Sequence, residues 1–401
     1  MELVGVEQIR AARETVHGVV RRTPVRRFTA LEQRCAVPVH LKCENLQRTG
    51  SFKIRGACAR IHSLSPAERA RGVVAASAGN HGQGVALAAA MVGAAATVYM
   101  PVTASLPKIA ATRGYGAQVH LVGDVVEQSM AAARAFAHDT GAVFIHPFDH
   151  VDVLAGQGTV GLEILEELPN VATVLVPVGG GGLIGGIAAA IKGVKPEVTV
   201  IGVHSDAAEV WPASLAAGAP VRVPARPTMA DGIAVSEVGP VSFAHVSALV
   251  DDMLTVGEEA LSHALLLCLE RTKMVVEPAG AAAVAALLAP TLALPGPVCA
   301  VLSGGNVDPL LLMHLIRHGL SAGRRFLTLR VTMPDRPGEL ATLLTLVGNS
   351  GANVVDVAHS RIGGNLTLGE VVVALSLETR GPQHSTELLA ALGAAGYEVT
   401  G

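Results

Sequence analysis

The chain contains the stretch Glu44-Asn45-Leu46-Gln47-Arg48-Thr49-Gly50-Ser51-Phe52-Lys53-Ile54-Arg55-Gly56-Ala57, in which Lys53 stands beside Phe52 and ahead of small residues. An amine among apolar groups is poorly solvated, which disfavours its ammonium form and lowers its pKa. Such a lysine can act as a nucleophile or a base, and Schiff-base chemistry requires one. Taken alone, the stretch is equally compatible with a lysine on the solvated first turn of a helix.

Four consecutive glycines, Gly179-Gly180-Gly181-Gly182, follow an apolar segment expected to be a strand and lead through Leu183 into an expected helix. Without side chains in the way, their backbone N–H groups can converge on a phosphate at the positive end of the helix. Gly180, Gly182 and Gly185 also fit the pattern G-x-G-x-x-G, with Asp206 roughly twenty residues further on. An NAD(P)-binding oxidoreductase is therefore an alternative, although it leaves Lys53 without a role.

Two more loops carry polar groups at positions expected to follow strands. Ser77-Ala78-Gly79-Asn80-His81 offers backbone N–H groups and the Ser77 hydroxyl, which could hold a carboxylate or merely cap a helix. Ser303-Gly304-Gly305-Asn306 follows the last strand expected in this part of the chain, at the edge where ligands of parallel sheets gather. On its own, that second loop is typical of a simple turn.

Ser51-Phe52-Lys53-Ile54-Arg55-Gly56 and the three loops, in this order, resemble the threonine/serine dehydratases, which use pyridoxal phosphate (PLP) and share the two-lobed fold type II of the tryptophan synthase β subunit. The resemblance covers about four fifths of the chain. It implies that Lys53 binds the cofactor aldehyde and that Ser77, Ala78, Gly79, Asn80 and His81 bind the substrate. The residues that it assigns to the cofactor are Phe52, Lys53, Asn80, Gly179, Gly180, Gly181, Gly182, Leu183, Gly232 and Ser303.

The resemblance also implies a reaction, the dehydration and deamination of L-threonine, and of L-serine, to 2-oxobutanoate or pyruvate and ammonia. In it, Lys53 removes the α-proton as general base, and a neutral hydroxyl at Ser303 favours expulsion of the β-substituent. Ala78 stands where related racemases carry a serine, so little racemisation is expected. His204 stands where the family often carries a cation ligand, so no metal is expected. Preference between threonine and serine, and a biosynthetic or catabolic role, cannot be read from the sequence.

Segments typical of strands and helices alternate from the strand expected at 72–76 to that at 298–302. Such alternation predicts an α/β fold in which parallel sheets are covered by helices on both faces. We expect a PLP-dependent catalytic domain over residues 1–322, with a smaller lobe at about residues 50–150. The remaining residues, 323–401, are expected to form a separate domain.

This last part predicts the order strand, helix, strand, strand, helix, strand, which is a ferredoxin-like unit. Its turn Asp335-Arg336-Pro337-Gly338 resembles that of an ACT domain, a module that binds amino acids in allosteric enzymes. The expected regulatory residues are Asp335, Arg336, Pro337, Gly338 and Asn353. A non-catalytic amino-acid sensor is therefore a further alternative.

Composition narrows the range of partners. The net charge is −3 and no long run of one sign occurs, so neither nucleic acid nor an anionic membrane is expected as a partner. The five cysteines form no paired framework, and the first residues lack the features of a signal peptide, both of which favour a cytoplasmic enzyme. We expect an amino-acid substrate, an amino-acid effector and a homo-oligomer, either a dimer or a tetramer.

Overall fold

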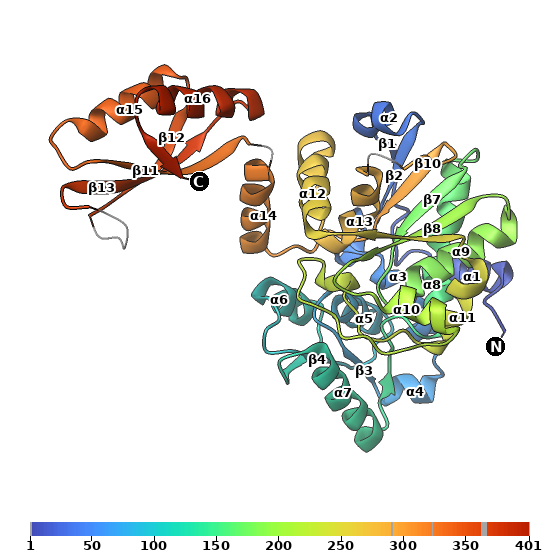
Figure 1. The fold of residues 1–401 in the computed structure, drawn as a ribbon. Helices are drawn as coiled ribbons and strands as arrows, with labels where there is room; N and C mark the ends of the chain where they lie inside the picture. The colour runs from blue at the N-terminus through green and yellow to red at the C-terminus, as the bar shows by residue number, and fades with distance from the viewer. Residues whose placement is uncertain (1, 290–291, 323, 362–366, 401) are drawn as a thin grey trace. The chain divides into compact units, whose positions relative to one another are not determined.

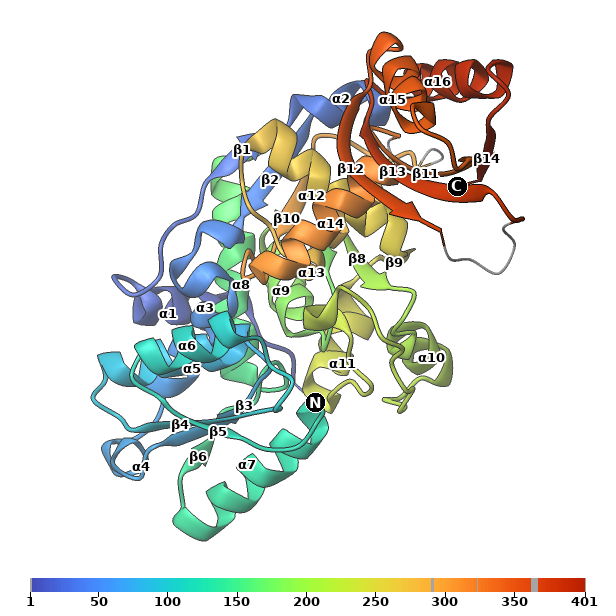
Figure 2. The ribbon, with the colours of Figure 1, turned by 90° about the vertical axis from the view of Figure 1, so that its left-hand side faces the viewer.

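The computed structural model describes residues 2–289, 292–322, 324–361 and 367–400 (Figures 1 and 2). Its contacts divide the chain into two compact units, Met1–Pro309 and Leu310–Gly401. None of the helices in these ranges combines the length and the apolar character that a membrane span requires. Each unit is built around its own core and is described by itself.

The first unit contains a six-stranded sheet in the order β1-β2-β10-β7-β8-β9. Only β1 runs antiparallel to its neighbour, and the other pairs are parallel. The three central strands are buried along their whole length or nearly so, as expected for parallel strands covered on both faces. The strands are Val25–Arg27 (β1), Val39–Cys43 (β2), Thr173–Pro177 (β7), Thr199–Ser205 (β8), Asp252–Val256 (β9) and Val298–Leu302 (β10).

A second, smaller sheet forms the other lobe of this unit and lies below the large sheet in Figure 1. Its four strands are all parallel, in the order β5-β4-β3-β6. They are Val73–Ala76 (β3), Ala96–Met100 (β4), Gln118–Leu121 (β5) and Val143–Phe144 (β6).

Helices cover both sheets and pack unusually closely, because small residues line their contacts. A Cβ at Gly186 would overlap the carbonyl oxygen of Leu154 on the neighbouring helix. Close backbone approach explains how a chain with only 3% aromatic residues fills its core. The helices are Val6–Val16 (α1), Thr29–Cys35 (α2), Lys53–His62 (α3), Pro66–Ala70 (α4), Asn80–Met91 (α5), Leu106–Gly114 (α6), Val126–Thr140 (α7), Val151–Glu167 (α8), Gly182–Val194 (α9), Val210–Ala217 (α10), Pro240–Leu249 (α11), Glu258–Thr272 (α12) and Pro278–Leu287 (α13), with the 3₁₀ turns Glu44–Leu46 (η1), Arg48–Gly50 (η2) and Asp231–Ile233 (η3).

Some local features differ from those expected from sequence. Helical spacing in the sequence extends from residue 6 to residue 20, but α1 ends at Val16. The next residue, His17, has a non-helical ψ of 138°, and Gly18 adopts a φ of +78°. The short strands β1 and β9 lie at the two edges of the large sheet. Both are partly exposed. β1 has only three residues, and the five of β9 are neither continuously buried nor alternating in burial, which is why the sequence did not reveal these strands.

The second unit begins within helix α14 (Pro309–Ala322), at its second residue, and continues as the βαββαβ order expected from the sequence. Its sheet is antiparallel in the order β12-β13-β11-β14, and β13 alternates between half-buried and buried residues up to its exposed last residue, Glu378. Leucines and valines of α15 and α16 complete the core on one face of this sheet. The elements are Phe326–Pro334 (β11), Glu339–Asn349 (α15), Asn353–Ser360 (β12), Glu370–Glu378 (β13), Pro382–Ala394 (α16) and Glu398–Thr400 (β14).

Candidate functional site

A cavity of about 610 Å³ lies in the first unit, where the loops that follow β3, β7 and β10 meet. Because these strands are parallel within their sheets, their carboxyl ends carry loops that can face one ligand. All the residues predicted to bind a cofactor or a substrate line this cavity: Phe52, Lys53, Ser77, Ala78, Gly79, Asn80, His81, Gly179, Gly180, Gly181, Gly182, Leu183, Gly232 and Ser303.

Lys53 is the first residue of α3, and its side chain enters the cavity. Its Nζ donates a hydrogen bond to the carbonyl oxygen of Pro147 at 2.9 Å and lies 5.1 Å from the centre of the Phe52 ring. Burial lowers the pKa of the amine to about 8, and the nearby carboxylate of Glu277 opposes this shift only in part. Lys53 does stand on a first helical turn, but with its amine desolvated it is available as a base or nucleophile near neutral pH.

The glycine loop packs tightly against two aromatic residues. A Cβ at Gly180 would overlap the Phe148 ring, and Gly181 adopts a φ of +91° with the Trp211 ring against it. The indole N–H of Trp211 donates to the carbonyl oxygen of Gly179 at 2.6 Å, which fixes the loop. Helix α9 starts at Gly182, so its first N–H groups have no partner within the helix. This cradle fits a phosphate group.

The loop after β3 is stabilised by the side-chain hydroxyl of Ser77, which lies within it. The Ser77 Oγ accepts a hydrogen bond from the N–H of Gly79 at 2.9 Å. Asn80 then begins α5 and donates from Nδ2 to Oε1 of Glu277 at 2.6 Å, while its Oδ1 accepts from Nδ2 of Asn306 at 2.8 Å. The amide of Asn80 is therefore fixed in orientation at the wall of the cavity.

His81 has a backbone partner as well as a place in the cavity wall. Its Nε2 lies 2.9 Å from the carbonyl oxygen of Ile145. Burial, together with the charge of Lys53, lowers the pKa of His81 to about 3, so the imidazole is neutral at physiological pH. A neutral ring that donates to a carbonyl group supports the loop instead of supplying charge.

Ser303 joins the end of β10 to the lysine loop. Its carbonyl oxygen accepts a hydrogen bond from the N–H of Phe52 at 3.1 Å, and its own N–H donates to the carbonyl oxygen of Gly280 at 3.3 Å. The residue is buried, with 4% exposure. These backbone bonds set the position of the Ser303 hydroxyl relative to Lys53.

The structure adds residues to the cavity that were not among the predicted site residues. Glu277, just before α13, is buried, and this burial raises its pKa to about 7. Phe148 covers the glycine loop, and Lys108 and Asp231 pair at 3.1 Å. A glutamate just before a helix is commonly placed there only because it is favourable at the N-terminus, and nothing in the sequence indicates that Lys108 and Asp231 would meet.

The expected regulatory residues do not gather at one point of the second unit. The turn from Asp335 to Gly338 joins β11 to α15, and Asp335 is paired with Arg361 through two hydrogen bonds of 2.7 and 3.1 Å. Asn353 lies at the opposite end of the sheet, because it pairs with Glu378 while Pro334 pairs with Glu370. At about 3.3 Å per residue along β13, the two ends are roughly 26 Å apart.

Comparison with known proteins identifies both units. Residues 16–304 match the family model for pyridoxal-phosphate-dependent enzymes, and residues 327–394 match that for the ACT domain. The chain is 47% identical to the L-threonine ammonia-lyase of Thermotoga maritima over 397 residues, which cover 99% of each chain. It is 45% identical to the L-threonine ammonia-lyase of Geobacter sulfurreducens, over 98% of each chain.

Solved structures agree with this result. The processed form of threonine deaminase isoform 2 from Solanum lycopersicum is 34% identical, with a TM-score of 0.73 over 78% of this chain and 89% of that chain. Maize serine racemase is 33% identical, with a TM-score of 0.74 over 80% of this chain and 100% of that one. The predicted α/β fold of type II with a C-terminal ACT domain is thereby confirmed. The chain belongs to the family of pyridoxal-phosphate-dependent enzymes and carries an ACT domain at its C-terminal end.

Proposed function

We propose that the chain is a PLP-dependent L-threonine ammonia-lyase, which converts L-threonine to 2-oxobutanoate and ammonia, and L-serine to pyruvate and ammonia. The observation that carries this proposal is the meeting of the Lys53 amine, the glycine loop and Ser303 in one cavity. The two full-length relatives, both named L-threonine ammonia-lyase, support the choice of substrate.

The walls of the cavity offer a partner for each part of the cofactor. The glycine loop, with Leu183 and the start of α9, would hold the phosphate. Lys53 would bind the aldehyde, and Ser303 and Asn80 would face the ring nitrogen and the phenolic oxygen. Phe52 and Gly232 would flank the ring. When bound, pyridoxal phosphate accepts the electron pair released at the α-carbon of an amino acid.

The protein's own groups would then bind the substrate and move protons. Ser77 to His81 would hold the substrate carboxylate through backbone N–H groups and the Ser77 hydroxyl. The amine of Lys53, with its pKa near 8, is neutral often enough at neutral pH to take the α-proton as general base. The β-hydroxyl would take up one proton and leave as water, which balances the α-proton removed by Lys53. The released unsaturated amino acid then takes up water and loses ammonia.

We expect the full chain, loaded with PLP, to release 2-oxobutanoate and ammonia from L-threonine in equal amounts. The ketoacid can be followed with a coupled reductase and the ammonia by a separate assay. Oxidation of threonine at the expense of NAD(P) would instead favour an oxidoreductase. Binding of amino acids without turnover would identify a sensor, and either result would contradict the proposed activity.

We further propose that residues 1–322 carry the reaction and that residues 323–401 regulate it by binding an amino acid. Asp335, Arg336, Pro337, Gly338 and Asn353 would contribute to that site. Since Asn353 lies far from the other four within one unit, a site that uses all of them requires a second copy of the chain. This supports a homo-oligomer, and the five unpaired cysteines support a cytoplasmic location.

Deleting residues 323–401 is expected to remove the response of the activity to isoleucine or valine while threonine turnover remains. The reason is that every residue lining the proposed catalytic cavity precedes residue 304. Initial rates at graded effector concentrations, for the full and the shortened chain, provide the measurement. If the full and the shortened chain responded identically to the effector, residues 323–401 would have no regulatory role and would serve only in assembly.

A further inference from the structure

Two polar contacts join the small lobe to residues 231–237, which run along the cavity. The Nζ of Lys108, on α6, lies 3.1 Å from Oδ2 of Asp231, the first residue of η3. The Ser236 hydroxyl donates to Oε1 of Glu127, on α7, at 2.9 Å. All four side chains belong to residues that line the cavity. The segment is therefore tied to the small lobe near both of its ends.

The ion pair also borders the loop expected to bind the substrate. The aliphatic part of Lys108 lies over Gly79, where a Cβ would approach Lys108 Cδ to 2.6 Å. The next residue, Asn80, donates to Oε1 of Glu277 at 2.6 Å. Lys108 is thus connected to Glu277 through two consecutive residues, Gly79 and Asn80, and one hydrogen bond.

Glu277 is surrounded by charged or polar groups from four different elements. Burial raises its pKa to about 7, Lys108 lowers it, Asp231 raises it, and the Asn80 hydrogen bond and Lys53 lower it. The Lys108 side chain is only 15% exposed, so water and salt screen its charge weakly, whereas Asp231 is 56% exposed. The carboxyl group therefore titrates near neutral pH in the same cavity as the Lys53 amine.

We propose that Lys108 and Asp231 form a charged clasp at the cavity that sets the proton occupancy of Glu277. Through Glu277, the clasp would set the lower step of the acid limb of the enzyme's pH profile, below the step that protonation of Lys53 produces. Both are positioning residues, because they act through Glu277 and not on the substrate. The ionised form of Glu277 accepts the hydrogen bond that fixes Asn80, whereas protonation removes charge from one acceptor and weakens that bond. The effect on activity rests on the proposed function, but the effect on the carboxyl group does not.

Lys108 and Asp231 shift the pKa of Glu277 in opposite directions. The inference can therefore be tested by the sign of the shift in each variant. Lys108→Met removes a cation and is expected to raise the pKa of Glu277. Asp231→Asn removes an anion and is expected to lower it. Each shift should amount to about half a pKa unit or more. At a fixed pH below the titration of Glu277, half a unit corresponds to roughly a threefold change in kcat/KM for threonine.

The pKa is read by ¹³C NMR of the full chain labelled at glutamate carboxyl groups, with Glu277→Gln used to identify the signal. The titration is made with and without PLP, so its result does not depend on turnover. Profiles of kcat and kcat/KM against pH are then measured for the same variants. An NMR shift without any threonine turnover would uphold the clasp and refute the proposed function.

Lys192→Met serves as the matched control. Lys192 forms an ion pair of 2.7 Å with Asp251 and is 17% exposed, but it does not line the cavity. This variant should leave the pKa of Glu277 and the acid limb unchanged. Lys108→Arg, which keeps the charge, should retain the wild-type pKa. Lys108→Gln, which also removes the charge, replaces Lys108→Met if that variant does not fold. Shifts of the same sign in Lys108→Met and Asp231→Asn, or no shift in either, would overturn the proposal.

Discussion

Replacing Lys53 by alanine is expected to abolish the formation of 2-oxobutanoate from L-threonine, with a loss of roughly four orders of magnitude or more. The variant loses both the amine that would bind the cofactor and the base that would take the α-proton. The absorbance of the lysine-bound cofactor near the edge of the visible range should disappear as well. Steady-state rates and the absorption spectrum of the protein mixed with PLP measure the two losses separately.

Lys53→Arg is the matched variant, because it keeps the positive charge and the length of the side chain. A guanidinium group is always protonated in proteins and cannot act as a nucleophile or base, so this variant should be as inactive as Lys53→Ala. Partial recovery of Lys53→Ala by an added small amine would show that the amine, not the fold, was lost. Turnover or the absorbance band retained in either variant would contradict the role assigned to Lys53.

The sequence was sufficient to predict those residues of the site that lie in contiguous motifs. Lys53 and Gly179 to Gly182 stand in short segments whose chemistry depends on adjacent residues, and all of them line one cavity. The strands that carry them are apolar and regularly spaced, so the α/β order could also be predicted.

Residues brought together only by folding could not be predicted. Lys108 and Asp231 are separated by more than a hundred residues, and neither stands in a motif. The raised pKa of Glu277 depends on burial, which no local pattern of charges reveals. Phe148 covers the glycine loop from a segment without secondary structure. Such features can be identified only in the folded structure, because they depend on tertiary packing.

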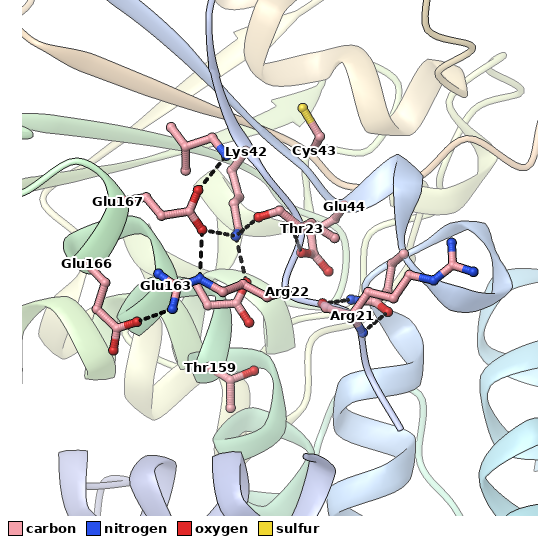
Figure 3. A network of polar contacts seen from close by, with 12 residues as sticks. Arg21, Arg22, Thr23, Lys42, Cys43, Glu44, Thr159, Glu163, Glu166 and Glu167 are labelled. Atoms are coloured by element: carbon pink, nitrogen blue, oxygen red, sulfur yellow. Dashed lines mark hydrogen bonds and ion pairs between the residues drawn. The ribbon is translucent and has the colours of Figure 1, made fainter. Parts of the chain in front are cut away.

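A buried network of charges beside α3, the helix that begins with Lys53, is a further feature that the sequence did not predict. Arg55, two residues after Lys53, is 0% exposed and lies between the carboxylates of Glu44 and Glu163, with bonds of 2.7 to 2.9 Å. Lys42 donates to the second carboxylate at 2.6 Å (Figure 3). The network joins the end of β2, α3 and α8, so it fixes the helix that begins with the catalytic candidate.

Arg55→Met is expected to lower the free energy of unfolding of the first unit by about 3–5 kcal/mol, because two buried carboxylates then share one cation. Burial alone would raise the pKa of Glu44, but the charge of Arg55 holds it below its ordinary value. In the native protein, this contribution is present above the ordinary pKa of glutamate and is lost as the pH falls through the lowered one. The deficit of Arg55→Met should therefore shrink in acid.

Urea unfolding of the full chain without cofactor, followed by Trp211 fluorescence, measures this effect, since the chain has a single tryptophan and it lies buried in the first unit. Arg27→Met removes a cation from a bidentate pair with Glu32 at the surface and should cost far less than Arg55→Met, because solvent screens such a pair. The double variant Arg55→Met/Glu44→Gln removes one charge of each sign and leaves the Lys42–Glu163 pair intact. It should be more stable than Arg55→Met alone, because an uncompensated buried carboxylate costs more than a lost pair. If Arg55→Met cost no more than Arg27→Met, or if the second substitution restored nothing, the network would not stabilise the helix through its charges.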